Sequence, residues 1–165
     1  MLVRVARLAA WALALGLLLA GCATPVRQAP ADPQAQVWSG RLALTVEGNQ
    51  SQSFSAGFEL QGRPETGQLT LFNPLGGTLA VLAWSPGAAT LRSGDKVQQF
   101  ESVEALAVQA TGAPLPITAL FDWLRGVETP VAGWQADVSQ VAQGRLRAQR
   151  NAPPPVAELR VAFER

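Results

Sequence analysis

Alternation of apolar and polar residues with a period of two is the feature that most constrains the fold of this chain. In the first such run, Leu42 and Leu44 alternate with Arg41 and Thr45. Because successive side chains of a strand point to opposite faces, each run predicts a strand with one apolar face. The predicted strands are residues 38–46, 53–60, 68–71, 78–85, 88–92, 96–100, 134–141, 145–150 and 158–163. We therefore expect a mainly β protein.

The predicted strand 78–85 differs from the others because it is apolar on both faces. Leu79 and Val81 alternate with Ala80 and Leu82 rather than with polar residues. We expect this strand to be covered on both sides.

Two short helical patterns interrupt the strands late in the chain. Ser102 is the expected N-cap of a helix over residues 102–110. Ile117, Leu120 and Phe121 share one face of a second helix over residues 117–124. Two short helices cover far less area than the apolar face of about nine strands. A single antiparallel sheet curled into a half-open barrel, with the helices across its opening, resolves this mismatch.

The N-terminus has the order of a secretory signal, with Arg4 and Arg7 followed by an uncharged apolar run over residues 8–20. The closing Leu19-Ala20-Gly21-Cys22 resembles the lipobox of bacterial lipoproteins, in which lipid is attached to the cysteine. We therefore expect a signal peptide over residues 1–21 and lipid on Cys22. The alternatives are an uncleaved anchor, for which the run is shorter than the ~20 residues of a span, and a secreted protein with a free thiol.

Residues 22–36 are rich in Pro, Ala and Gln and predict an acylated, flexible linker before a domain over residues 37–165. Fully extended, such a linker reaches at most about 45–50 Å. The folded domain is therefore expected to be tethered to a membrane yet free to tilt.

Composition excludes most enzyme chemistry. The chain has no histidine and one cysteine, so zinc sites, Ser-His-Asp triads and Cys-His pairs cannot be assembled. Its 13 basic and 12 acidic side chains become 11 and 12 once Arg4 and Arg7 leave with the signal, which disfavours nucleic acid as a partner. The acidic cluster of Asp95, Glu101 and Glu104 is interpreted as solvated capping charge rather than as an acid–base pair. We expect no catalytic residue, metal or cofactor.

Four segments in order carry a resemblance to a known family. They are Gly40-Arg41-Leu42-Ala43-Leu44, Asn73-Pro74-Leu75-Gly76, Pro114-Leu115-Pro116 with Leu120-Phe121-Asp122-Trp123-Leu124-Arg125-Gly126, and Gly133-Trp134. Together with the lipobox they resemble LolB, a family of outer-membrane receptors in lipoprotein sorting. The resemblance implies an incomplete barrel with a helical lid and a hydrophobic cavity. It also implies a non-enzymatic receptor that takes triacylated lipoproteins from the periplasmic carrier LolA and inserts them into the outer membrane.

The chain departs from the family at its C-terminal end, where Pro153-Pro154-Pro155 leads directly into the last predicted strand. Ala23 follows Cys22 in place of the aspartate that retains lipoproteins at the inner membrane in enteric bacteria. The expected location is therefore the periplasmic face of the outer membrane, held by the lipid. We expect a monomer.

The resemblance assigns two sets of site residues. Pro74, Leu75 and Gly76 form a loop whose leucine is expected to protrude and contact outer-membrane lipid, rather than fold back over the strand ends. The expected lining of the acyl-chain cavity is Leu42, Leu44, Phe54, Phe58, Leu69, Leu71, Val81, Leu120, Phe121 and Trp134. Each of these residues is alternatively ordinary core.

Two other functions remain open on the sequence. A structural or assembly lipoprotein with a filled core would bind a protein partner through its sheet and have no cavity. A lipid-modifying enzyme is disfavoured by the missing histidine and the lack of a nucleophile motif.

Overall fold

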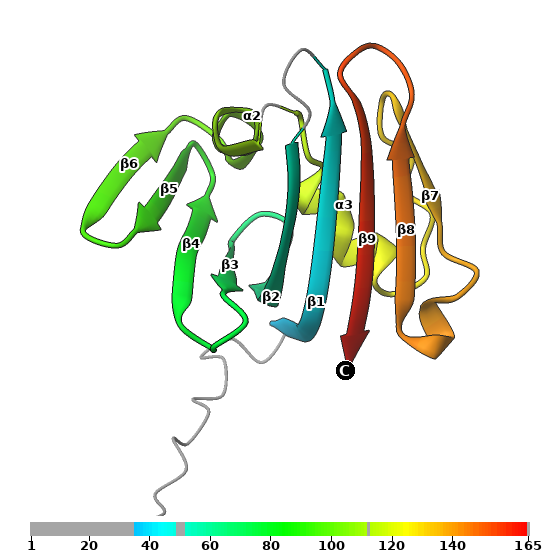
Figure 1. The fold of residues 1–165 in the computed structure, drawn as a ribbon, viewed down its shortest axis with the longest axis horizontal. Helices are drawn as coiled ribbons and strands as arrows, with labels where there is room; N and C mark the ends of the chain where they lie inside the picture. The colour runs from blue at the N-terminus through cyan, green and yellow to red at the C-terminus, as the bar shows by residue number, and fades with distance from the viewer. Residues whose placement is uncertain (1–34, 49–51, 112, 165) are drawn as a thin grey trace, which may run out of the picture.

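A computed structural model describes residues 35–48, 52–111 and 113–164. Within these ranges nine strands form one antiparallel sheet in the order β6-β5-β4-β3-β2-β1-β9-β8-β7 (Figure 1). The strands are β1 (Gln36–Glu47), β2 (Gln52–Gly62), β3 (Gly67–Phe72), β4 (Thr78–Ser85), β5 (Ala88–Ser93), β6 (Lys96–Phe100), β7 (Trp134–Asp137), β8 (Arg145–Arg150) and β9 (Val156–Glu164). The mainly β, single-sheet prediction is confirmed.

The last strand lies in the middle of the sheet. Strands β1 to β6 are hydrogen-bonded in sequence order, and the chain then passes through the helices before returning on the far side of β1. There β9 pairs with β1, Leu44 opposite Leu159, and also with β8. Strands β6 and β7 are left as the two edges of the described sheet. The sheet is therefore an incomplete barrel.

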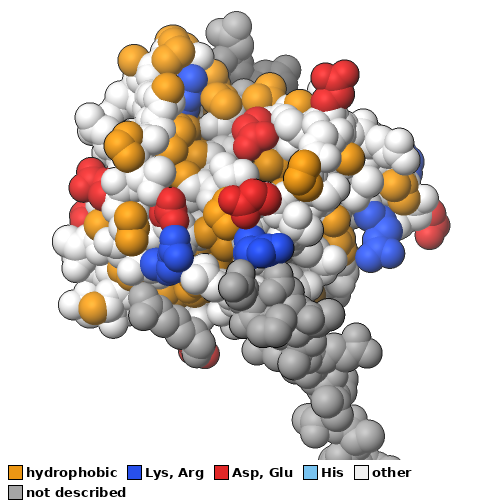
Figure 2. All heavy atoms as spheres, turned by 180° about the vertical axis from the view of Figure 1, so that it is seen from behind, with side chains coloured by type: hydrophobic (Ala, Val, Ile, Leu, Met, Phe, Trp, Pro, Cys, Tyr) orange, Lys and Arg blue, Asp and Glu red, His pale blue; other side chains and the backbone are white. Residues whose placement is uncertain are grey.

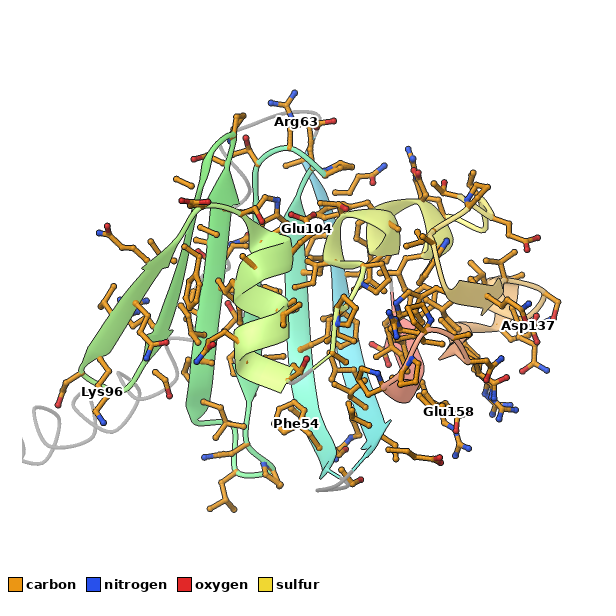
Figure 3. The ribbon with its side chains drawn as sticks, turned by 90° about the horizontal axis from the view of Figure 1, so that it is seen from above. Phe54, Arg63, Lys96, Glu104, Asp137 and Glu158 are labelled. Atoms are coloured by element: carbon orange, nitrogen blue, oxygen red, sulfur yellow. The ribbon has the colours of Figure 1, made fainter. Side chains whose placement is uncertain are left out.

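Both α-helices lie on one face of the sheet, in front of it in Figure 3, and α3 is seen behind the central strands in Figure 1. Helix α2 (Val103–Thr111) begins where expected, because the Ser102 hydroxyl accepts a hydrogen bond of 3.1 Å from the Ala105 amide. Helix α3 (Ile117–Trp123) buries most of its side chains, including Ile117 and Phe121. No helix in the described ranges is long and apolar enough to cross a bilayer.

A cluster of aromatic rings packs between the sheet and helix α3. Phe121 of α3 meets Trp38 of β1 edge-on, with ring centroids 5.7 Å apart, and Trp84 of β4 at 6.1 Å. The Trp84 indole donates a 2.9 Å hydrogen bond to the Pro64 carbonyl. This packing anchors α3 to the centre of the sheet.

Two expectations for strands are wrong. The strand predicted over residues 134–141 ends at Asp137, because the Asp137 carboxylate accepts a 3.0 Å hydrogen bond from the Ser139 amide and turns the chain. A short 3₁₀ turn, η1 (Val141–Gln143), follows. In β4 only Leu82 and Trp84 are buried, so this strand is covered on its helix side and not on both sides.

Candidate functional site

An apolar cavity of about 420 Å³ lies between the sheet and the two helices. Strands β1 to β5 and β9 form one wall, and α2, the following loop and the start of α3 form the other. The lining is Leu42, Leu44, Val46, Phe54, Leu69, Leu71, Leu79, Ala80, Leu82, Leu91, Ser93, Ala107, Ala110, Thr111, Leu115, Pro116, Ile117, Leu120 and Leu159. The cavity volume falls within the ~300–1,000 Å³ range of ligand pockets.

Strand register explains why leucines gather on this wall. Leu82 of β4 lies between Leu69 of β3 and Leu91 of β5, so the three side chains point to the same face. The helix wall is built differently, since α2 presents Ala107 and Ala110 to the cavity. Small side chains on α2 leave space that larger ones would fill.

Among the described residues, no charged side chain lines the cavity, and its two hydroxyls already donate hydrogen bonds. Ser93 donates a 3.0 Å hydrogen bond to the Leu79 carbonyl. Thr111 donates to the carbonyl of Ala107, four residues earlier, at 2.8 Å. The interior therefore suits an uncharged apolar ligand and provides no group for acid–base or metal chemistry.

The mouth of the cavity lies near Phe54 and Leu79, which are 38% and 37% exposed. Figure 3 places Phe54 near one end of the strands, beside the C-terminal end of α2 and away from Arg63. Leu69 and Leu82 mark the deep part, since both are buried. On the helix-side face in Figure 2, hydrophobic side chains are interspersed with basic, acidic and other polar ones.

Six of the ten residues predicted to line a cavity do line it. They are Leu42, Leu44, Phe54, Leu69, Leu71 and Leu120. The other four lie elsewhere. Val81 points to the other face of β4, because it is one residue away from Leu82 and successive side chains of a strand alternate between faces. Its register partners are Thr70 and Arg92.

The remaining three aromatic residues belong to the core. Phe58 and Phe121 are buried, and Phe121 packs against Trp38 and Trp84 outside the cavity lining. Trp134 begins β7, beyond the cavity, where its indole donates a 2.9 Å hydrogen bond to the Pro114 carbonyl.

Several lining residues were not among those predicted. Val46 continues the alternation of Leu42 and Leu44, and Leu91 lies between Thr90 and Arg92, so alternation provided a signal for both. It provided none for Leu82, because β4 is apolar on both faces. Ala107 and Ala110 lie on the apolar side of the predicted helix but carry no signal that distinguishes cavity wall from core.

The loop between β3 and β4 is held in shape by Asn73. Its side-chain oxygen accepts hydrogen bonds of 2.9 Å from the amides of Leu75 and Gly77. Gly76 has a φ of +85°, a conformation that residues with a Cβ rarely adopt. The Leu75 side chain is 96% exposed and does not fold back over the strands. Pro74 and Gly76 are exposed with it.

Charged pairs lie outside the cavity. Thr129 donates a 2.6 Å hydrogen bond to Asp122 of α3, and this bond, with help from the paired Arg125, lowers the pKa of the Asp122 carboxyl. Arg160 donates two hydrogen bonds, of 2.9 and 3.0 Å, to Glu158, and lowers its pKa together with Arg147. Within the described residues, no group of His, Cys, Asp and Glu could hold a metal ion. Cys22, the signal peptide and nearly all of the linker lie outside the described residues.

Comparison with known proteins identifies the family. The model of the outer membrane lipoprotein LolB matches residues 34–163. The chain belongs to the LolB family. The outer-membrane lipoprotein LolB of Bordetella petrii is 40% identical over 149 residues, which cover 84% of this chain and 72% of that protein. The LolB proteins of Chromobacterium violaceum and Cupriavidus metallidurans are 35% and 34% identical, over 83% and 87% of this chain and 76% and 72% of their own lengths.

Membership in LolB confirms the expected class of function. The family is one of outer-membrane lipoproteins that act in lipoprotein localisation as receptors and not as enzymes. The LolB fold expected from the sequence is consistent with the open nine-stranded sheet and its two helices. A lipid-modifying enzyme is therefore no longer a candidate.

Proposed function

We propose that this LolB protein accepts the acyl chains of lipoproteins from a LolA-type periplasmic carrier and delivers the lipoproteins to the outer membrane. The observation that carries the proposal is an apolar cavity of about 420 Å³ next to a loop with an exposed leucine; none of the described residues that line the cavity is charged. The cavity also argues against the alternative of a structural lipoprotein with a filled core.

Burial of acyl chains provides the driving force. Each methylene removed from water contributes about 0.8 kcal/mol, so one 16-carbon chain contributes on the order of 10 kcal/mol. Leu42, Leu44, Leu69, Leu71 and Leu120 replace the interior of the bilayer for such a chain. Transfer then needs no catalytic group, because an acyl chain taken up by the cavity moves between apolar environments of similar free energy.

Release requires contact with the receiving membrane. Leu75 protrudes at the tip of the loop. Leu79, at the cavity mouth, lies two residues after Gly77, where the loop ends. An exposed leucine on a short ordered turn inserts into lipid at little cost in conformational entropy. We propose that Leu75 brings the mouth to the outer-membrane surface, where cargo leaves.

Lipid on Cys22 would keep the domain near that surface. In this proposal the lipid anchor raises the efficiency of delivery and does not create the activity. A soluble form with Cys22→Ala should still accept lipoproteins.

The experiment is transfer of a radiolabelled lipoprotein from purified LolA to this protein, and then to liposomes. We expect the label to move to this protein and to sediment with the liposomes only when this protein is present. Failure of the label to leave LolA would refute the proposal.

A further inference from the structure

The volume of the cavity sets how much of a lipid anchor it holds. An apolar cavity of about 150 Å³ binds one benzene molecule, which gives about 25 Å³ for each carbon atom. On this scale the cavity of about 420 Å³ holds on the order of 17 carbons. That is one acyl chain of about 16 carbons and not three.

The polar end of such a chain has no partner inside. The Ser93 and Thr111 hydroxyls donate to backbone carbonyls, and no charged side chain is among the lining residues that the structure describes. A carboxylate or ester buried there would lose its hydration without a new hydrogen bond. The head group therefore stays at the mouth, beside Phe54 and Leu79.

We infer that the cavity takes one acyl chain at a time, tail first, with its head group outside at the mouth. A triacylated anchor then engages by a single chain, and its other two chains remain outside the cavity. This inference rests on the proposed function for its biological ligand, but its physical content concerns any single-chain lipid.

Substitutions at Leu71 and Ala80 should change the number of carbon atoms that the cavity holds in opposite directions. They are register partners on β3 and β4, and both line the cavity. Ala80→Leu adds three carbons to the wall, and Leu71→Ala removes three. Ala83 lies on the same strand as Ala80 but does not line the cavity, so Ala83→Leu is the matched control.

The binding test uses the segment 23–165, which retains every described strand and helix. Straight-chain fatty acids of about 8 to about 20 carbons compete with a fluorescent fatty acid for the protein. We expect one fatty acid bound per protein, with affinity rising roughly tenfold for every two added carbons. The rise should stop near about 16 carbons. Two or more fatty acids per protein, no binding, or a rise that continues to the longest chain would overturn the inference.

The variants test whether the cavity wall sets this limit. Ala80→Leu should shorten the chain length at which affinity stops rising by about three carbons, and Leu71→Ala should lengthen it by about three. Ala83→Leu should leave it unchanged. An equal shift in Ala83→Leu, or no shift in Leu71→Ala, contradicts the inference. If Ala80→Leu does not fold, Leu71→Ala still tests the inference, because it removes atoms at a half-buried position.

Transfer from LolA to liposomes, measured in parallel, separates this inference from the proposed function. Binding of one fatty acid without any transfer refutes the proposed function and supports the single-chain capacity. Transfer by a protein that binds two or more fatty acids refutes the capacity and supports the function.

Discussion

The Trp134 indole donates a 2.9 Å hydrogen bond to the Pro114 carbonyl and ties the start of β7 to the loop between α2 and α3. The two residues are 20 positions apart in the sequence, so the bond joins the two ends of the segment that contains α3. Trp134 is buried, and its ring centroid lies 6.5 Å from that of Trp123. This contact fixes the loop that carries Leu115 and Pro116 to the cavity wall.

Trp134→Phe should keep most of the apolar contact and remove the hydrogen bond. We expect the free energy of unfolding to fall by about 1–3 kcal/mol, because the half-buried Pro114 carbonyl loses its donor and the smaller ring leaves space. Urea unfolding followed by circular dichroism measures the change. Trp134→Phe with wild-type stability would show that the bond contributes nothing.

Gly40 belongs to the Gly40-Arg41 motif and lies on β1 opposite Phe163 of β9. A Cβ at this position would overlap the Ala162 carbonyl oxygen and crowd Phe163 Cα. Both obstacles are backbone, so the strands must separate to accept it. Gly40→Ala should destabilise the protein by more than about 2 kcal/mol.

Gly48→Ala is the matched control for Gly40→Ala, since no atom lies within 4 Å of a Cβ at residue 48. Its unfolding free energy should stay within about 0.5 kcal/mol of wild type. Equal midpoints of thermal unfolding for the two variants would contradict the role assigned to Gly40.

Local patterns in the sequence predict most strands and helices of this fold, but not which strands lie next to each other in the sheet. Period-two alternation identifies β1 and β2, and the Ser102 cap marks the start of α2. The position of β9 could not be predicted, because its pairing with β1 joins segments more than 100 residues apart and depends on the path of the helices. Alternation reports the face of a side chain and carries no information about the adjacent strand.

The candidate site was predicted in part for a related reason. Leu42 and Leu69 share a face with Phe58, yet Phe58 is core while the leucines line the cavity. The difference arises from the helix wall, where Phe121 fills one end and Ala107 leaves space at the other. For β4, apolar residues on both faces gave no basis for choosing Leu82 over Val81.

The hydrogen bond from Thr129 makes stability depend on pH through Asp122. The pKa of Asp122 is lowered in the folded state, chiefly by the hydrogen bond from Thr129. The folded protein therefore binds fewer protons at this carboxyl than the unfolded chain does. The stabilisation is complete above the unfolded pKa of about 3.9 and is lost as pH falls through the lower folded pKa. Because Asp122 is partly exposed, we expect less than about 1 kcal/mol.

Thr129→Val tests this dependence without removing a charge. Its unfolding free energy should lie below that of wild type at pH near 6, and the difference should shrink at pH near 3. Chemical unfolding at the two pH values provides the measurement. A difference that is constant with pH would mean that Thr129 acts through packing and not through Asp122.

Leu75→Glu should separate acceptance of cargo from its delivery. Leu75 makes no buried contact, so the charge should change the unfolding free energy by less than about 0.5 kcal/mol and leave the cavity intact. A carboxylate at the loop tip opposes insertion into lipid, because burial of a charge in hydrocarbon is costly. The variant should take labelled lipoprotein from LolA as wild type does and release at least tenfold less to liposomes, if about 1.4 kcal/mol of membrane contact is lost. Val97→Glu, at an exposed position on β6 outside this loop, is the control and should deliver normally. Normal delivery by Leu75→Glu, or an equal defect in Val97→Glu, would remove the loop from the mechanism.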